Sequence, residues 1–346
     1  MLSKKNFRIP LDKFIENALY NPTNGYYMKS FPFGKQGDFI TSPHISKIFS
    51  EMIAIWLISY WKKFYKNKKI NIIELGAGSG DMMNDIINSS RKFDDFYNNS
   101  QFVIFEKSKN LIKLQKKKLK KKVNWISNLN QINKKPTIFL GNEFLDALPI
   151  KQYLRKNNKW HERYVQKKNN SYNFINLSSN IKKLENEIDF KISEKQKFIE
   201  ISIEEIKIIK KLNKIISNEG GCMLFIDYAY NSHKMQDTLQ SVKKHKKVNI
   251  FKYVGKSDIT HLINIPNLKK IVKKLNLNIS YTSQRNFLLN LGILQRAEIL
   301  SANKNFLEKA NIYYRINRLI DKNKMGELFK VIYIHPKNKK FNTGFE

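Results

Sequence analysis

The segment NIIELGAGSGD, residues 71–81, has glycine at every second position after an apolar run that ends in an acid. A glycine-rich turn between a strand and a helix brings backbone N–H groups close to a ligand at the helix N-terminus. A P-loop would need Gly-Lys-Ser/Thr after the turn, and a dinucleotide fingerprint would need its third glycine at position 81, which is aspartate. The segment therefore fits neither of these phosphate-binding loops.

The acid at the strand end indicates a different ligand. A carboxylate beside a tight turn suits a ligand that carries a cationic amino acid moiety and no pyrophosphate, as S-adenosylmethionine does. We predict that this cofactor binds at the loop residues Glu74, Gly76, Ala77, Gly78 and Gly80. The alternative is that the glycines only form a tight turn.

A second carboxylate is expected where the ribose of the cofactor would lie. In dinucleotide-binding folds this acceptor ends the second strand, about 20 residues after the glycines. The strand QFVIFE supplies Glu106, 30 residues after Gly76, and the segment DMMNDIINSSRKFDDFYNN accounts for the longer spacing. The alternative is that Glu106 is a solvated strand end.

Beyond residue 70, apolar runs of strand length alternate with segments of helical periodicity. The expected strands are KINIIELG, QFVIFEKS, KVNWISN and PTIFLGNE, and the expected helices between them are DMMNDIINSSRKF and KNLIKLQKKKLKK. This alternation predicts an α/β fold, a Rossmann-like parallel sheet with helices on both faces.

We divide the chain into three parts. Residues 1–66 are predicted to form an N-terminal extension of helices and an ordered loop. Residues 67–150 and 204–346 are predicted to form the α/β core with C-terminal helices. Between them, residues 151–203 are predicted to be a β-rich insertion, in which two short strands flank an Asn-Asn turn.

The composition limits the partners. The net charge of +35 would normally suggest nucleic acid or an anionic surface. Only eight of the 64 basic residues are arginine, the residue best suited to bidentate phosphate and base contacts. Lysine instead fills ordinary surface helices, which favours a solvated surface over a binding patch, although an acidic partner is the alternative.

Other residue types exclude several site classes. The single cysteine, Cys222, cannot form an intramolecular disulfide, and its apolar surroundings predict an unreactive core residue. The six histidines show no metal-binding spacing, so no metal site is expected. The chain lacks a run of ~20 apolar residues, a signal peptide's h-region and the character of a transit peptide, so we expect a cytoplasmic bacterial protein.

Several longer blocks resemble the MidA-type S-adenosylmethionine-dependent methyltransferases. These blocks appear in the family's order over roughly residues 10 to 300: NPTNGYYMKSFPFGKQGDFITSP, IELGAGSGD, GNEFLDALPIKQY, FIDYAY with DTLQSVKKH, GKSDIT and QRNFLLNLGILQR. The resemblance implies a class I methyltransferase fold. The family's mitochondrial member is an assembly factor of respiratory complex I that methylates an arginine of a complex I subunit.

The chain departs from the family pattern at three places. His44 stands where members usually have glutamate, Ala229 stands where they have glycine, and HLINI, His261 to Ile265, replaces Ala-His-Val-Asp-Phe. None of these positions belongs to the predicted cofactor loop.

The resemblance implies a guanidinium acceptor, which requires carboxylates that hold it by paired hydrogen bonds. Ligands in such sheets lie beyond the carboxyl ends of the strands, where TIFLGNE brings Asn142 beside the cofactor and Glu143 and Asp146 beside its methyl group. Methyl transfer needs an in-line nucleophile about 3 Å from the methyl carbon. We therefore predict catalytic roles for Glu143 and Asp146; alternatively, Asp146 caps a helix and Glu143 is a structural ion-pair partner.

Further side chains are candidates for the same site. Asp38, in GDFITSP, is a third predicted catalytic carboxylate that could close over cofactor or substrate, with a local Asx hydrogen bond as the alternative. Asp227 and Tyr228 end the strand FIDYAY on the same side of the sheet, where they could line the acceptor pocket. The aromatic side chains that could exclude water from the sulfonium are Tyr26, Tyr27, Phe31 and Phe33; the alternative, and the commoner role of aromatic residues, is packing in the core.

The first hypothesis is thus a protein arginine N-methyltransferase that acts on a complex I subunit or a similar protein. Its partner would be a protein, with nucleic acid disfavoured, no membrane span, and a homodimer as one option. The alternatives are an RNA methyltransferase, suggested by the charge, and a non-catalytic assembly scaffold with the same fold.

Overall fold

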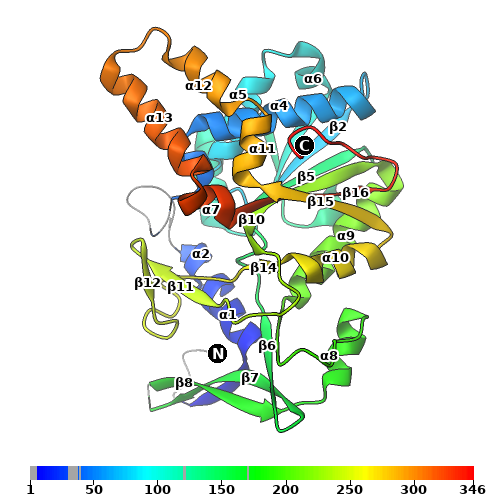
Figure 1. Ribbon diagram of the computed structural model, residues 1–346, viewed down its shortest axis with the longest axis vertical. Helices are drawn as coiled ribbons and strands as arrows, with labels where there is room; N and C mark the ends of the chain where they lie inside the picture. Colours follow the sequence, from blue (N-terminus) through cyan, green and yellow to red (C-terminus); the bar gives the residue numbers. More distant parts are fainter. Residues whose placement is uncertain (1–5, 30–37, 39, 120–121, 170) are drawn as a thin grey trace.

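The computed structural model describes residues 6–29, 38, 40–119, 122–169 and 171–346. Its largest sheet has eight strands, in the order β15-β16-β10-β5-β2-β3-β4 with β14 beside β10 (Figure 1). The strands are β2 (Ile70–Leu75), β3 (Ser100–Phe105), β4 (Val123–Ile126), β5 (Thr137–Asn142), β10 (Gly221–Tyr230), β14 (Ile263–Asn264), β15 (Leu277–Ser283) and β16 (Phe329–Pro336).

The predicted α/β sheet is confirmed, with one difference in strand direction. Strands β4, β3, β2, β5 and β10 are parallel, whereas β16 runs antiparallel to both β10 and β15. A buried apolar run reads the same in either direction, so its composition does not reveal the orientation.

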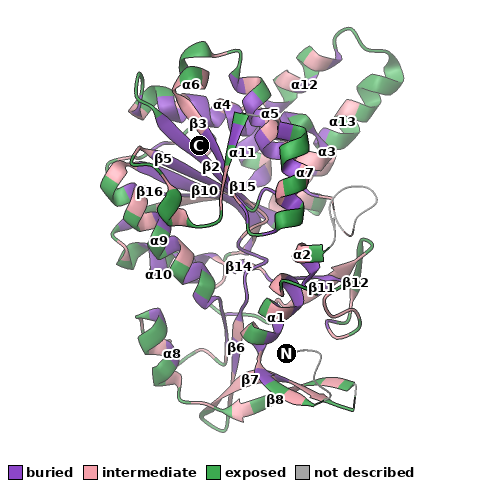
Figure 2. Ribbon diagram, turned by 180° about the vertical axis from the view of Figure 1, so that it is seen from behind, coloured by how far each residue is buried: buried purple, intermediate pink, exposed green. Residues whose placement is uncertain are grey.

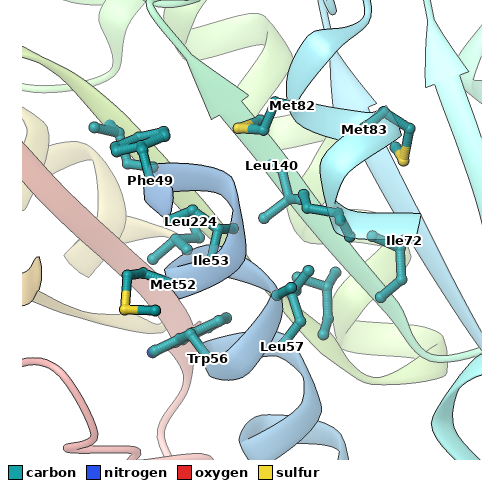
Figure 3. Close-up of a cluster of buried hydrophobic side chains, with 14 of the residues drawn as sticks. Phe49, Met52, Ile53, Trp56, Leu57, Ile72, Met82, Met83, Leu140 and Leu224 are labelled. Atoms are coloured by element: carbon teal, nitrogen blue, oxygen red, sulfur yellow. The ribbon is translucent and has the colours of Figure 1, made fainter. Parts of the chain in front are cut away.

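Helices cover both faces of this sheet, as predicted. Helices α4 (Lys47–Phe64) and α5 (Asp81–Ser90) pack on one face, where Trp56 and Leu57 meet Ile72 and Leu224 (Figure 3). Helices α9 (Ile203–Glu219) and α10 (Ile265–Lys274) pack on the other. The strands supply apolar side chains to both cores, which explains their continuous apolar runs. Cys222 is buried in the first core, as expected.

A second lobe lies below the sheet (Figure 1), and it combines three distant parts of the chain. Strand β1 (Phe7–Pro10) pairs with β7, so the N-terminal segment joins the sheet of the predicted insertion. That sheet contains β6 (Lys151–Lys156), β7 (Lys159–Lys168), β8 (Ser171–Ser178) and β9 (Phe198–Ile201), with α8 (Ile181–Ile188) between β8 and β9. Strands β6 and β7 flank the predicted Asn-Asn turn.

The lobe is completed by a helix and a small sheet. Helix α1 (Leu11–Tyr20) buries Phe14 against Ile150, Val165 and Ile259. A three-stranded sheet is formed by β11 (Gln240–Lys243), β12 (Lys246–Val248) and β13 (Asp258–Thr260). The proposed division of the chain into three domains remains a prediction.

The remaining helices surround the sheet. They are α2 (Tyr26–Lys29), α3 (Ser42–Ile45), α6 (Asp94–Asn99), α7 (Lys109–Leu119), α11 (Gln284–Asn290), α12 (Ile293–Ser301) and α13 (Phe306–Ile320), with the short turns η2 (Leu129–Gln131) and η3 (Lys322–Gly326). Buried residues concentrate on the central strands, and the outer helix faces are exposed (Figure 2). In the described part of the chain, no helix is both long and apolar enough to cross a membrane.

Candidate active site

A cavity of about 920 Å³ opens at the carboxyl ends of β2, β3 and β5, between the sheet and the second lobe. Eight of the ten predicted site residues line it: Glu74, Gly76, Ala77, Gly78, Glu106, Asn142, Glu143 and Asp146. The other two, Gly80 and Asp38, are described by the structure but are not part of the wall.

The glycines of the loop permit a tight turn between β2 and α5. Gly76 and Gly78 have φ angles of 66° and 53°, in the left-handed region where a side chain is strained. A Cβ atom at Gly76 would lie 3.0 Å from the Phe144 ring. Gly80, with a φ of 79°, is the N-cap of α5, so it shapes the loop from behind the cavity wall.

Two buried oxygens at the strand ends have no hydrogen-bond partner in the described structure. They are Oε2 of Glu74 and Oδ1 of Asn142, and both residues line the cavity. Burial, with a contribution from the charge of Asp81, raises the pKa of Glu74 to about 8. Unpaired acceptors at such a place fit a cationic, hydrogen-donating group, which S-adenosylmethionine carries in its amino acid moiety.

Glu106 is buried at the end of β3, not solvated. Its Oε1 accepts the backbone N–H groups of Lys107 and Ser108, both at 2.9 Å, and its Oε2 lies 3.3 Å from Gln115 Nε2. These contacts fix the carboxylate in the cavity wall. Because Oε1 already accepts two hydrogen bonds and Oε2 only one, Oε2 keeps a lone pair for another donor.

Asp227 shapes the turn that follows β5. Its Oδ2 accepts the backbone N–H groups of Phe144, Leu145 and Asp146, at 3.1, 2.8 and 3.3 Å. Glu143, at the start of this turn, has a φ of 51°, which is unusual for a residue with a side chain. The prediction that Asp227 lines the pocket was wrong, because its side chain is fully buried and consumed by the turn.

One side of the cavity is acidic and phenolic. We call this part the acceptor chamber, and define it by Tyr20, Tyr27, Glu143, Asp146 and Asp258. The Tyr27 hydroxyl donates to Asp258 Oδ1 at 2.7 Å, and the Tyr20 hydroxyl donates to the carbonyl of Ala147 at 2.9 Å. The two rings stack with centroids 5.6 Å apart.

The acids of the acceptor chamber retain protons more strongly than usual. Burial, reinforced by the charge of Asp227, raises the pKa of Glu143 to about 8 and raises that of Asp146 well above its ordinary value. Burial also raises the pKa of Asp258 to about 6. Among the described residues, no cation contributes to the main causes of these three shifts, so the three acids fit a positively charged ligand.

Asp38 connects two surface elements. It accepts hydrogen bonds from the Tyr26 hydroxyl at 2.8 Å and from the Lys244 backbone N–H at 2.9 Å, which joins α2 to the β11–β12 turn. Of the other candidates, Tyr228 is outside the cavity wall and packs on Phe329. Phe31 and Phe33 lie outside the described residues.

His44 and Asp81 lie at the edge of the cofactor loop. His44 Nε2 is 2.8 Å from Ser79 Oγ and 3.2 Å from Asp81 Oδ2, while His44 Nδ1 is 2.6 Å from Thr41 Oγ1. Although burial opposes ionisation of Asp81, hydrogen bonds from His44, Lys118 and Ser79 hold its pKa well below its usual range. The departure at position 44 therefore places a histidine against an anionic residue of the loop.

His261, where the chain departs from the family pattern, is a buried residue of the protein core. The side chain is buried, and burial lowers the pKa of His261 to about 4, so the imidazole is neutral. Its backbone N–H donates to the Asp146 carbonyl at 3.1 Å.

Sequence reasoning missed three parts of the cavity wall. Ser127, Asn128 and Leu129 follow the carboxyl end of β4 and face the same cavity. Asp258 belongs to GKSDIT, a block noted in the sequence without a role. The third part is the exposed side of α9, represented by Ile208 and Lys211. The strand-end rule could have identified the first part, whereas the other two require the folded chain.

Relatives and a solved structure resemble this chain over most of its length. The protein arginine methyltransferase NDUFAF7 of Danio rerio is 28% identical over 93% of this chain and 82% of its own length. The Homo sapiens protein of that name is 26% identical over 95% of this chain and 80% of its own. A crystal structure from Burkholderia thailandensis, bound to S-adenosyl-homocysteine, has a TM-score of 0.79 at 22% identity and covers 98% of this chain and 89% of that one. This last likeness supports the fold.

The match to a family profile identifies the chemistry. The family described as "Putative S-adenosyl-L-methionine-dependent methyltransferase" matches residues 52–282, which contain the glycine loop, the turn after β5 and Asp258. The match covers well over half of the chain. The protein therefore belongs to this family of S-adenosylmethionine-dependent methyltransferases.

Proposed function

We propose that the protein transfers the methyl group to a guanidinium nitrogen of an arginine in a protein substrate. The observation that carries this proposal is the acceptor chamber, where Glu143, Asp146 and Asp258 line the same cavity with no cation paired to them among the described residues, in a chain with a net charge of +35. A buried set of acids fits a planar cation that donates several hydrogen bonds. The names of the relatives support the same substrate class.

The cofactor would lie across the strand ends. Glu74, Asn142 and the loop of Gly76, Ala77 and Gly78 would hold its amino acid moiety, and Gly80 would shape the loop. Glu106 would accept hydrogen bonds from its ribose. Ser127 to Leu129 would contact its base, because they line the next position along the strand ends. When bound, S-adenosylmethionine supplies a methyl group on a positively charged sulfur.

Glu143 and Asp146 would bind the guanidinium by paired hydrogen bonds and direct one nitrogen toward the methyl group. The new N–C bond would form as the S–C bond breaks, and the methylated nitrogen would release a proton. Ionised Glu143 would accept that proton. Asp38 would act indirectly: its hydrogen bonds would hold the β11–β12 turn against α2, without contact to the substrate.

By resemblance, the substrate that we propose is a subunit of respiratory complex I or a similar protein, methylated in support of its assembly. The lysine-rich surface does not oppose this, because none of the five residues that define the acceptor chamber is basic. A homodimer is one option for the working form of the enzyme.

The test uses the purified protein, methyl-labelled S-adenosylmethionine and a cell extract. After protease or ribonuclease treatment, label is expected in peptide, and after acid hydrolysis, in methylated arginine. Glu143→Gln should reduce incorporation roughly 100-fold. Glu194→Gln, which changes an exposed acid in the second lobe, is the matched control and should retain activity.

Three results would contradict the proposal, and each would favour a different function. Label that ribonuclease removes would identify an RNA methyltransferase. Label in another amino acid would retain the methyltransferase and overturn the arginine assignment. Cofactor binding without any transfer, by a folded protein in all extracts tested, would favour the assembly scaffold.

A further inference from the structure

Gln115 is a buried amide on the inner side of α7, behind the cofactor loop. Its side chain is fully buried, although glutamine is usually a surface residue. It lies one helical turn from Leu111 and one from Leu119, which are buried on the same side of the helix. Gln115 is not part of the cavity wall. The reason for burying this amide must therefore be found in the groups that it binds.

Three hydrogen bonds satisfy the amide of Gln115. Nε2 donates to the Gly78 carbonyl at 2.8 Å and to Glu106 Oε2 at 3.3 Å, while Oε1 accepts the indole N–H of Trp125 at 2.9 Å. The orientation of the amide is fixed, because an indole N–H can only donate and a carbonyl can only accept. Trp125, on β4, therefore directs both N–H groups of Gln115 to the cofactor loop and to Glu106.

Helix α7 contacts the cofactor loop at two further points. A Cβ atom at Gly80 would lie 3.3 Å from Cγ of Gln115 and 3.2 Å from Cδ1 of Leu119, so the lack of a side chain at this glycine allows α7 to pack closely. Lys118 Nζ lies 2.7 Å from Asp81 Oδ1. These contacts explain why the loop needs Gly80, although this residue lies outside the cavity wall.

The hydrogen bond to Glu106 decides which oxygen of that carboxylate is left for a ligand. Oε1 already accepts the backbone N–H groups of Lys107 and Ser108, whereas Oε2 accepts one hydrogen bond, from Gln115. Burial raises the pKa of Glu106, and hydrogen bonds, including the one from Gln115, oppose this rise. Gln115 thus holds Oε2 in place and favours the ionised carboxylate, which is the better acceptor for ribose hydroxyl groups.

The hydrogen bond to Gly78 fixes the direction of one peptide in the loop. In a planar trans peptide, the C=O group and the following N–H group point in opposite directions. Because the Gly78 carbonyl points to α7, the N–H of Ser79 points away from that helix, and Ser79 lines the cavity. Without Gln115, the Gly78 carbonyl would lose this partner, and the left-handed conformation of the glycine would lose a restraint.

We propose that Gln115 is a positioning residue that prepares both halves of the cofactor site at once. It fixes Glu106 for the ribose and the peptide between Gly78 and Ser79 for the amino acid moiety. This role rests on the placement of the cofactor under the proposed function. The two halves of the site belong to different strand–helix connections, and one amide joins them. A substitution at Gln115 should therefore weaken the binding of both.

The experiment is calorimetric titration of the full-length protein with two ligands. S-adenosyl-homocysteine carries both halves of the cofactor, whereas 5′-methylthioadenosine carries the ribose and the base without the amino acid group. Gln115→Met keeps the length of the side chain but cannot donate, so the Kd for S-adenosyl-homocysteine should rise roughly 10–100-fold. The Kd for 5′-methylthioadenosine should rise roughly tenfold, through the loss at Glu106. Trp125→Phe removes only the N–H that orients the amide and should raise both constants by smaller factors.

Two comparisons separate positioning from a general loss of stability. Gln152→Met removes the hydrogen bonds of another fully buried glutamine, in the second lobe, and should leave both constants unchanged. In Glu106→Ala, Gln115 has no carboxylate to position. Adding Gln115→Met to that variant should therefore raise the Kd for 5′-methylthioadenosine by less than about twofold, because residues in one network are not additive. Thermal unfolding shows that each variant is folded.

Each of four outcomes would overturn the proposal. Unchanged constants in folded Gln115→Met would show that the loop and Glu106 keep their positions unaided, with the cofactor placement intact. A loss for S-adenosyl-homocysteine alone would refute the link to Glu106. An equal loss in Gln152→Met would attribute the effect to stability. A folded wild type that binds neither ligand would overturn the cofactor placement and, with it, the role of Gln115.

Discussion

The carboxylate of Asp227 accepts the backbone N–H of Leu145 at 2.8 Å, which fixes the end of β10 to the turn that carries Glu143 and Asp146. Two more N–H groups of the turn bind the same oxygen. The two strands are neighbours in the sheet but are separated by about 80 residues in sequence. Asp227 thus positions the acceptor acids without touching the cavity.

Asp227→Asn should lower the rate of methyl transfer without changing the affinity for the cofactor, because Asp227 positions the turn that carries Glu143 and Asp146. If the amide NH₂ group replaces Oδ2, it cannot accept the three N–H groups, so Glu143 loses its support. We expect kcat to fall roughly 10–100-fold, the range found for groups that orient catalytic ligands, while the Kd for S-adenosylmethionine changes little. Glu200→Gln, at another buried acid in the second lobe, is the control. An unchanged kcat would show that the turn holds its shape without Asp227.

Gly76→Ala should weaken cofactor binding. The left-handed conformation costs a residue with a side chain about 1–2 kcal/mol, and the new Cβ would press on the Phe144 ring. Calorimetric titration should show a Kd for S-adenosylmethionine at least roughly tenfold higher, with most of the thermal stability retained. Equal affinity in variant and wild type would exclude the loop from the cofactor site.

Methyl transfer should accelerate with pH up to about 8. The reaction needs ionised Glu143 to hold the guanidinium, and burial keeps this side chain protonated below its raised pKa of about 8. The kcat/KM should therefore rise up to tenfold per pH unit below that value and level off above it. In Glu143→Gln the remaining activity should lose this part of the rise. An activity that falls between pH 6 and 8 would contradict the assignment.

The protein without ligands should be more stable at mildly acidic pH. Burial raises the pKa values of Glu74, Glu143 and Glu205 from 4.5 to about 8. Between these values the folded state keeps protons that the unfolded chain has released, so the free energy of unfolding decreases as pH rises. Each group contributes up to about 1.4 kcal/mol per pH unit. Thermal unfolding between pH 5 and 8 measures the trend, and Glu205→Gln should reduce its slope; a Tm that rises with pH would refute it.

His44→Glu should destabilise the cofactor loop, although glutamate is the residue usual in the family. Here the new carboxylate would face Asp81, whose Oδ2 is 3.2 Å from His44 Nε2. Repulsion between the two acids should raise the Kd for S-adenosylmethionine several-fold. His44→Gln keeps a hydrogen-bond donor and should bind nearly as the wild type does. Tighter binding by the glutamate variant would mean that Asp81 turns away from position 44.

The amino-acid sequence by itself determined the α/β core and the cofactor edge of the site. Strand and helix periodicity predicted β2 to β5 and the helices between them, because buried parallel strands need continuous apolar runs. Glu74, the glycines, Glu106 and Asn142 were predicted because they lie at or just after strand ends, which meet at one edge of a parallel sheet, and all of them except Gly80 line the cavity. The direction of β16 was not visible, because an apolar run has no polarity.

Only the tertiary structure decided how the acceptor chamber is built. Asp258 and Tyr27 line the same cavity as Glu143 and Asp146 because elements distant in sequence pack together, and no local sequence pattern encodes that arrangement. Tertiary packing also gives two nearby acids different roles. Asp227 is buried in the core and binds the backbone of the turn, whereas Glu143 lines the cavity. The pKa values of these acids also depend on burial, which is a property of the packed chain and not of the residue type.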